Sequence, residues 1–167
     1  MSRKVRESAV PFIVQKRKKR SIGVSSRKAE WKIVTPKRRL KWSSTTERIN
    51  LTRKGVPFSA VEVVGKKGSL TVARMLNLLD LPQTTYNKKK REDELLDVRD
   101  SEILLVLSEV LDFGLFVFND EKEKFHNWLS TKNSSLGGVT PESLFDSLTG
   151  IEEVRGALQR LEYGNLA

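Results

Sequence analysis

The spacing of apolar residues in the last quarter of the chain is compatible with only one kind of structure, a set of short packed helices. Phe125, Trp128 and Leu129 follow an i, i+3, i+4 pattern, so they share one face of a helix that ends in the polar run at 130–135. A loop containing two adjacent glycines leads to a second apolar stripe that continues to Leu161. The region 125–164 is therefore predicted to be a helical hairpin.

Local signals predict where the helices of this hairpin begin and end. Thr140 before Pro141 is typical of a helix start, because proline at the first helical position loses no intrahelical hydrogen bond. Thr149 and Glu152 form a capping box that opens a second helix, and Gly164 stands where glycine commonly ends one. An apolar stripe of this kind is most often ordinary core. The spacing alone therefore does not show what the region binds.

The motifs of this region, taken in order, resemble the C-terminal toxin-binding domain of the Xre/MbcA/ParS antitoxins. The motifs that carry the resemblance are Trp128-Leu129, Leu136-Gly137-Gly138, Thr140-Pro141, Gly150 and Leu161-Glu162-Tyr163-Gly164. The resemblance implies that a toxin protein binds this region. The toxin-binding residues that it implies are Trp128, Leu136, Gly137, Gly138, Pro141, Leu161, Glu162, Tyr163 and Gly164.

The charge of the chain is divided unevenly along its length. Residues 1–68 hold 20 lysines and arginines against 4 acidic residues, whereas residues 69–167 hold 11 against 17, within an overall net charge of +10. Such a division predicts a polyanionic partner for the first part of the chain and a different partner for the second. Nucleic acid is the commonest such polyanion.

Residues 1–43 are predicted to form a basic, mostly flexible arm, because their apolar residues follow neither a helical nor a strand period. Two apolar patches, at 10–14 and at 31–34, are candidates for short strands or docked segments. The arm is also rich in arginine and serine and poor in acids, as organelle transit peptides are, and its run at 15–20 matches a nuclear-import cluster. Both alternatives remain open at this stage.

From Ser44 onward the pattern is that of short helices. Ser44 and Glu47 form a capping box, Gly55 ends the first helix, and Pro57 is predicted to open the next. Ser69 or Thr71 then caps an apolar helix. A tight turn at 80–82 joins this helix to a cationic one at 83–91, which is the arrangement of a helix-turn-helix with a DNA-facing second helix.

The run Thr85-Tyr86-Asn87-Lys88-Lys89 resembles the recognition helix of the Xre-type antitoxins, with tyrosine and lysine at two positions where leucine and arginine are usual. Lysine is a point charge, whereas arginine can grip guanine with two hydrogen bonds, so base recognition is expected to depend more on the polar residues of the helix. The predicted DNA-binding residues are Gln83, Thr84, Thr85, Asn87, Lys88 and Lys89. The alternative is that the lysines only keep an exposed helix in solution.

A long helix is predicted from a cap at Asp100 or Ser101 to Phe118, with apolar residues on both of its faces. Such width implies burial on more than one side, and a second copy of the chain is a candidate for one of them. The predicted fold is all-α, with a helix-turn-helix domain followed by a small helical toxin-binding domain. The predicted domains are an arm at 1–43, the helix-turn-helix at 44–99, a connecting and dimerisation helix at 100–119, and the toxin-binding domain at 120–167.

Composition argues against several other classes of protein. The chain has no cysteine and a single histidine, His126, so it offers no thiolate or histidine metal site, and we expect neither a cofactor nor catalysis. No apolar run approaches the roughly 18 residues that would span a bilayer, and no secretory signal is recognisable, so no membrane contact is expected. The resemblance to a bacterial antitoxin family implies a cytoplasmic protein of bacteria.

The resemblance covers the chain from about residue 48 onward and implies an antitoxin of a type II toxin–antitoxin pair. Such an antitoxin would block a toxin encoded beside it and bind its own operator DNA as a homodimer. It is most similar to antitoxins of RES-domain toxins, which degrade NAD+. A stand-alone helix-turn-helix regulator remains the alternative, and a nucleic-acid-processing enzyme is disfavoured because the sequence lacks a phosphate loop and paired catalytic groups.

Overall fold

The computed structural model describes residues 30–164, which form seven α-helices, two short 3₁₀ turns and one β-hairpin. The hairpin comes first, with β1 (Trp31–Val34) antiparallel to β2 (Arg39–Trp42) and Trp31 opposite Trp42. The helices follow as α1 (Thr45–Lys54), α2 (Ala60–Lys67), α3 (Val72–Leu78), α4 (Gln83–Arg91), α5 (Val98–Val117), α6 (Lys122–Ser130) and α7 (Leu148–Glu162). The 3₁₀ turns η1 (Ser134–Leu136) and η2 (Pro141–Leu144) lie between α6 and α7.

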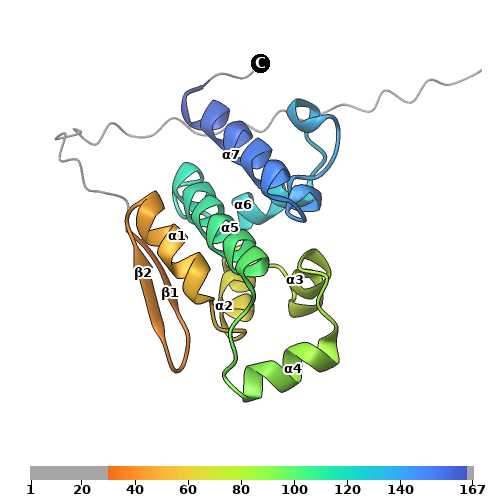
Figure 1. The fold of residues 1–167 in the computed structure, drawn as a ribbon. Helices are drawn as coiled ribbons and strands as arrows, with labels where there is room; N and C mark the ends of the chain where they lie inside the picture. The colour runs from red at the N-terminus through yellow and green to blue at the C-terminus, as the bar shows by residue number, and fades with distance from the viewer. Residues whose placement is uncertain (1–29, 165–167) are drawn as a thin grey trace, which may run out of the picture.

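Helix α5 is the centre of the molecule. It contacts the hairpin, α1, α2, α6 and α7, and Figure 1 shows it between α1 on one side and α7 on the other. Thirteen of its 20 residues are buried. The prediction that this helix is buried on more than one side is therefore confirmed within a single copy of the chain.

The close packing of α6 on α5 depends on a glycine. A Cβ atom at Gly114 would lie 2.3 Å from two carbons of the Phe125 ring, so no larger residue fits there without a shift. Phe125 is fully buried and contacts the rings of Phe118 and Trp128. This aromatic cluster joins the end of α5 to the C-terminal part of the chain.

The predicted flexible arm is wrong for its last part, because residues 31–42 form the hairpin. Ile33 is completely buried and Trp42 is 1% exposed, so the hairpin gains apolar burial that a solvated arm would lack. The patch at 31–34 is the strand that the sequence allowed as an alternative. Residues 1–29, including the patch at 10–14 and the basic run at 15–20, lie outside the described residues.

Several predicted helix boundaries shift by a few residues. The long helix α5 begins at Val98, where Asp97 caps it by accepting a hydrogen bond from the amide of Asp100, instead of at a cap on Asp100 or Ser101. Helix α7 is capped by Ser147, not by Thr149, and α2 starts after Ser59 instead of at Pro57. Sequence signals for caps recur within one turn, and the packed structure selects among them.

Other predicted caps are confirmed. Ser44 accepts a hydrogen bond of 3.2 Å from the amide of Glu47 at the start of α1, and Gly55 ends that helix with a φ of 86°. Thr71, not Ser69, caps α3. The connection from α3 to α4 and the bounds of α4 agree with the helix-turn-helix prediction.

Two candidate binding surfaces

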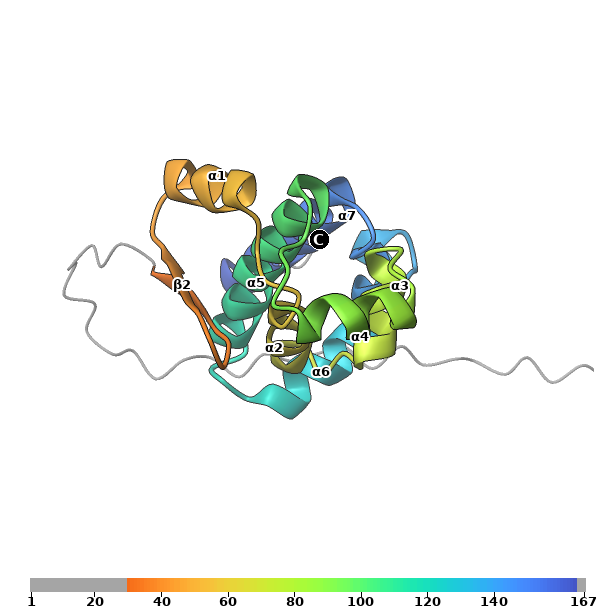
Figure 2. The same cartoon turned by 60° about the horizontal axis from the view of Figure 1, so that its bottom comes forward.

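Helix α4 is anchored to the body by one aromatic side chain. Tyr86 is 2% exposed and its ring lies 6.4 Å from that of Phe58, between centroids. The turn before α4 is held by a hydrogen bond of 2.9 Å from the amide of Leu81 to the carbonyl of Leu76. Because one face of this short helix is buried, its opposite face is exposed, and Figure 2 shows α4 at the front of the molecule, free of other helices over that face.

The predicted DNA-binding residues divide into three groups. The exposed residues are Gln83, Thr84, Asn87 and Lys88, and the side-chain Nε2 of Gln83 donates to Oδ1 of Asn87 at 3.0 Å. Thr85 is half-buried. Lys89 forms an ion pair of 3.0 Å with Glu94 and lies over the Phe58 ring. The structure thus brings four of the six residues to the outer face and leaves Lys89 partly engaged within the chain.

The neighbouring Lys90 holds α4 against α2. Its ammonium donates to Glu62 at 2.7 Å, and this hydrogen bond raises the pKa of Lys90 and lowers that of Glu62. Both side chains are about one third exposed, so the pair is screened by water and contributes well under about 1 kcal/mol. Not every cation of α4 is therefore directed outward.

The predicted toxin-binding loop is a closed loop at 133–139. The amide of Asn133 donates to the carbonyl of Val139 at 2.9 Å, and the amide of Gly138 donates back to the carbonyl of Asn133 at 2.9 Å. Gly137 and Gly138 have φ values of 74° and 80°, and a Cβ atom on either would meet nothing within 4 Å. These glycines are therefore required for the backbone conformation and not for packing within the chain.

Two of the predicted toxin-binding residues near this loop are buried. Trp128 is 4% exposed and Pro141 is also buried, so these two predicted toxin-binding residues have little surface to offer a partner and instead shape the loop. Gly150 allows η2 to approach the start of α7, since its Cβ would lie 2.1 Å from the carbonyl oxygen of Leu144. The exposed part of the predicted site is consequently smaller than the sequence indicated.

The C-terminal end of α7 forms a separate exposed region. Leu161 and Glu162 are half-buried, Tyr163 is 78% exposed, and Gly164 follows with a φ of 72°. Figures 1 and 2 both show the loop with η1 on one side of α7 and this end of α7 away from it. The loop 133–139 and the C-terminal end of α7, the two predicted toxin-binding segments, therefore lie apart and do not form one continuous site.

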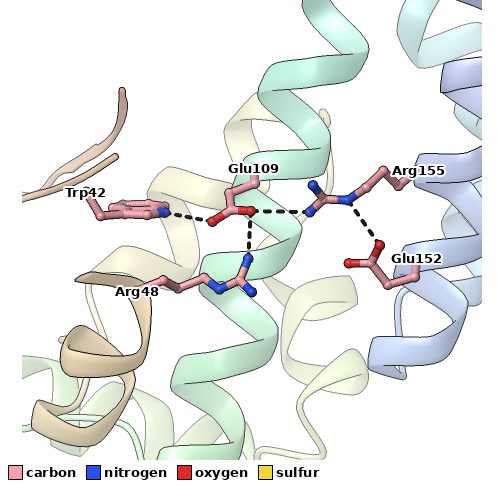
Figure 3. Close-up of polar contacts among 5 residues, drawn as sticks. All are labelled: Trp42, Arg48, Glu109, Glu152 and Arg155. Carbon is pink, nitrogen blue, oxygen red and sulfur yellow. Dashed lines mark hydrogen bonds and ion pairs between the residues drawn. The ribbon is translucent and has the colours of Figure 1, made fainter. Parts of the chain in front are cut away.

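A buried carboxylate that the sequence did not indicate lies in the middle of α5. Glu109, in the middle of α5, is 4% exposed and accepts hydrogen bonds from Trp42 at 2.7 Å, Arg48 at 2.7 Å and Arg155 at 3.2 Å (Figure 3). Arg155 also forms an ion pair of 3.2 Å with Glu152. The network joins the hairpin, α1 and α7. One signal could have indicated it, namely a glutamate placed among the apolar residues of a helix predicted to be buried.

Within 30–164, no three side chains among His, Asp and Glu lie close enough to hold a metal ion. In the same range, no helix is both long and apolar enough to cross a bilayer.

Comparisons with known proteins match two parts of this chain to two described domains. Residues 47–107 match the family described as the antitoxin Xre-like helix-turn-helix domain, and residues 115–164 match the antitoxin Xre/MbcA/ParS C-terminal toxin-binding domain. A protein from Yersinia enterocolitica named antitoxin Xre is 25% identical over 122 residues, which are 73% of this chain and 82% of that protein.

Two further relatives show similar coverage. Antitoxin Xre from Photorhabdus laumondii is 24% identical over 123 residues, covering 73% of this chain and 83% of the relative. A protein from a Sphingobium species named Prs ADP-ribosylating antitoxin is 29% identical over 133 residues, covering 75% and 84%.

The fold and its two surfaces define a helix-turn-helix protein that carries a second, helical binding domain. By these two domains the chain belongs to the Xre/MbcA/ParS antitoxins, the antitoxin components of type II toxin–antitoxin systems.

Proposed function

We propose that this antitoxin blocks its toxin with the loop 133–139 and the C-terminal end of α7, and that it binds its own operator DNA through the outer face of α4. The observation that carries the toxin-binding part is the match of residues 115–164 to a toxin-binding domain, in which Gly137, Gly138 and Tyr163 of these two segments are exposed. Tyr163 is a large amphipathic side chain with most of its area in solvent, as an interface anchor requires.

We propose further that the toxin is a RES-domain protein that degrades NAD+. This identity is supported by the similarity of the motifs from Trp128 to Gly164 to antitoxins of such toxins. It is tested by expressing the toxin gene adjacent to this one and measuring cellular NAD+ with and without the antitoxin. A neighbouring toxin that leaves NAD+ unchanged contradicts the RES assignment but not the antitoxin function.

The test of the toxin-binding surface is Glu162→Ala with Tyr163→Ala, compared with the parent protein for growth rescue, thermal unfolding and operator binding. We expect toxin inhibition to be lost while folding and operator binding are kept. Full inhibition by the double variant would mean that the end of α7 is not the inhibitory element. Variants of the loop 133–139 would then be examined next.

The test of the DNA-binding surface is Asn87→Ala with Lys88→Ala, because both side chains are exposed on the outer face of α4. We expect specific binding to DNA upstream of the gene to be abolished in a gel-shift assay, with toxin inhibition near normal. Operator binding equal to that of the parent would show that α4 is not the recognition helix. Absence of any adjacent toxin gene, with DNA binding intact, would favour a stand-alone regulator.

A homodimer is part of the proposal, since two half-sites separated by one turn of DNA require two copies of α4. Phe116, near the end of α5, is 49% exposed, and it stacks on the half-buried Phe113 with ring centroids 6.4 Å apart. This aromatic pair is a candidate for the contact between copies. Sedimentation of the parent and of Phe116→Ser tests it, with a shift to monomer expected for the variant.

A further inference from the structure

The turn between β1 and β2 is a rigid, cationic structure that the sequence did not predict. We call residues 35–39, which are this turn and the first residue of β2, the hairpin tip. The amide of Thr35 donates to the carbonyl of Arg38 at 2.9 Å, and the Thr35 hydroxyl both donates to that carbonyl and accepts from the Arg38 amide, each at 3.0 Å. Thr35 itself is 5% exposed. The three bonds close the turn around a buried side chain.

The strands below the tip are fixed to the body of the protein. Ile33 and Trp42 are buried, the indole of Trp42 donates to Glu109, and the ammonium of Lys67 donates to the carbonyl of Lys32 at 3.3 Å. A partner that binds the tip would therefore find it already ordered, so little conformational entropy is lost on binding.

The tip reaches the C-terminal end of α4. A guanidinium nitrogen of Arg38 lies 3.3 Å from a carboxylate oxygen of Asp93, two residues beyond the last residue of α4. Figure 1 shows the tip and α4 at the same end of the molecule. The contact joins residues 55 positions apart and places the tip next to the proposed recognition helix.

The combined edge is positively charged. The tip contributes Lys37, Arg38 and Arg39. The second half of α4 contributes Lys88, Lys89 and Arg91, because the charge of its Lys90 is balanced by the ion pair with Glu62 of α2, and three acids follow at 92–94. Two of these acids, Asp93 and Glu94, are each held in an ion pair with a cation of the same edge. The edge thus keeps a net charge of +3, and Lys37 and Arg39 are exposed.

We infer that the hairpin tip is a second DNA contact, with Lys37 and Arg39 binding phosphates of the strand beside the groove that α4 enters. This inference rests on the proposed DNA binding by α4 and adds a separate contact to it. Lysine and arginine side chains on an ordered turn suit phosphate oxygens, which position a protein on the duplex without reading its sequence. The contact of Arg38 with Asp93 places the tip beside the C-terminal end of α4, so the two elements would engage DNA together.

The first test uses a double variant of the tip, in which Lys37→Ala and Arg39→Ala are combined. Its control is a second double variant, Lys122→Ala combined with Lys132→Ala, which removes two exposed cations elsewhere. Point substitutions are needed because deletion of residues 1–43 would also remove the buried Ile33 and Trp42. The probe is the DNA immediately upstream of the gene, titrated at several salt concentrations. Each lost phosphate contact lowers the slope of log affinity against log salt by about 0.9, so the tip variant should be shallower by nearly 2 and bind roughly tenfold more weakly.

The second test locates the tip on the duplex. Because the chain has no cysteine, Lys37→Cys gives a single thiol that can carry an iron chelate, whose hydroxyl radicals cut nearby DNA. We expect cuts in the strand that flanks the bases protected by α4. An absence of localised cuts, or an unchanged salt slope in the alanine variant, overturns the inference while leaving recognition by α4 intact.

Two other outcomes separate the inference from the function on which it rests. If the parent protein binds no upstream DNA, operator binding itself is wrong and the inference falls with it. If the tip variant binds DNA normally but no longer inhibits the toxin, the tip contacts the toxin instead, which also overturns the inference.

Discussion

The outer face of α4 and the loop 133–139 expose different chemical groups to a partner. The helix presents side chains, mainly amides and cations, on a regular backbone, whereas the loop presents the backbone itself at two exposed glycines with positive φ. Side-chain charges act over a Debye length and are weakened by salt, but a backbone shape is not. DNA binding by α4 should therefore decline gradually with each lost charge, whereas toxin binding by the loop should depend on the conformation of its backbone.

The largest effect is expected at Glu109, the buried carboxylate of α5 that joins the hairpin, α1 and α7. Glu109→Ala removes the acceptor of three hydrogen bonds and leaves Arg48 and Arg155, each about three quarters buried, without this carboxylate. We expect a loss of about 3 kcal/mol in the free energy of unfolding, measured with urea, because a partly buried ionic network is broken. Both binding activities should fall together.

The matched control for this prediction is Glu152→Ala, since Glu152 is an exposed partner of the same Arg155. That variant should lose less than about 1 kcal/mol. Equal losses in the two variants would mean that Glu109 is no more important than a surface carboxylate, and that apolar packing alone holds the hairpin, α1 and α7 to α5.

A selective break of the C-terminal region is predicted for Gly150→Ala. The added methyl group would collide with the carbonyl oxygen of Leu144, so η2 must move, at a cost of about 2 kcal/mol within the range usual for overpacking. Thermal unfolding should detect this loss, and toxin inhibition should weaken while operator binding is kept.

Gly156→Ala is the control, because it lies on the same helix and its Cβ would meet only the flexible end of Arg160 at 3.5 Å. Alanine is the better helix former, so this variant should be neutral or slightly more stable. If Gly150→Ala weakened operator binding as strongly as toxin inhibition, the two regions would not be separable.

A smaller effect is expected within the loop itself. Gly138→Ala places a side chain at a φ of 80°, which costs about 1 kcal/mol and shifts the loop toward other conformations. Toxin affinity, measured by calorimetry, should fall while the melting temperature changes little. Ser134→Ala in the same loop is the control, and an equal loss of affinity in that variant would exclude the special role of the glycine backbone.

The smallest effect concerns pH at the start of α5. Burial raises the pKa of Asp100, with Asp97 adding to the rise and Arg99 opposing it. A carboxyl group with a raised folded-state pKa binds protons more tightly when folded, so it costs stability as pH rises above about 4. Asp100→Asn should therefore be slightly more stable than the parent at pH 7, by under about 1 kcal/mol, with the difference vanishing near pH 3.

Urea unfolding at the two pH values checks this prediction, with Glu102→Gln, a less buried carboxylate on a different face of α5, as the control. A variant that is less stable than the parent at pH 7 would show that the ion pair between Arg99 and Asp100, 3.0 Å long, outweighs the cost of burial.

Helix content and the order of the two domains could be read from the sequence because their signals are local. The spacing of Phe125, Trp128 and Leu129 predicted a buried helical face, and the turn at 80–82 predicted the junction of α3 and α4. Such patterns depend on residues within one or two turns of each other, where the period of the helix decides which side chains share a face.

The tertiary structure decided what depends on distant partners. The indole N–H of Trp42 is buried against Glu109, 67 positions away, which accepts its hydrogen bond, and Arg155 reaches the same carboxylate from α7. The spacing of neighbouring residues in the sequence does not indicate contacts between such distant residues. For this reason the hairpin was assigned to a flexible arm and Glu109 was missed. The same reason explains Trp128 and Pro141, whose motifs indicated a binding site while the packing of α6 and η2 placed their side chains inside.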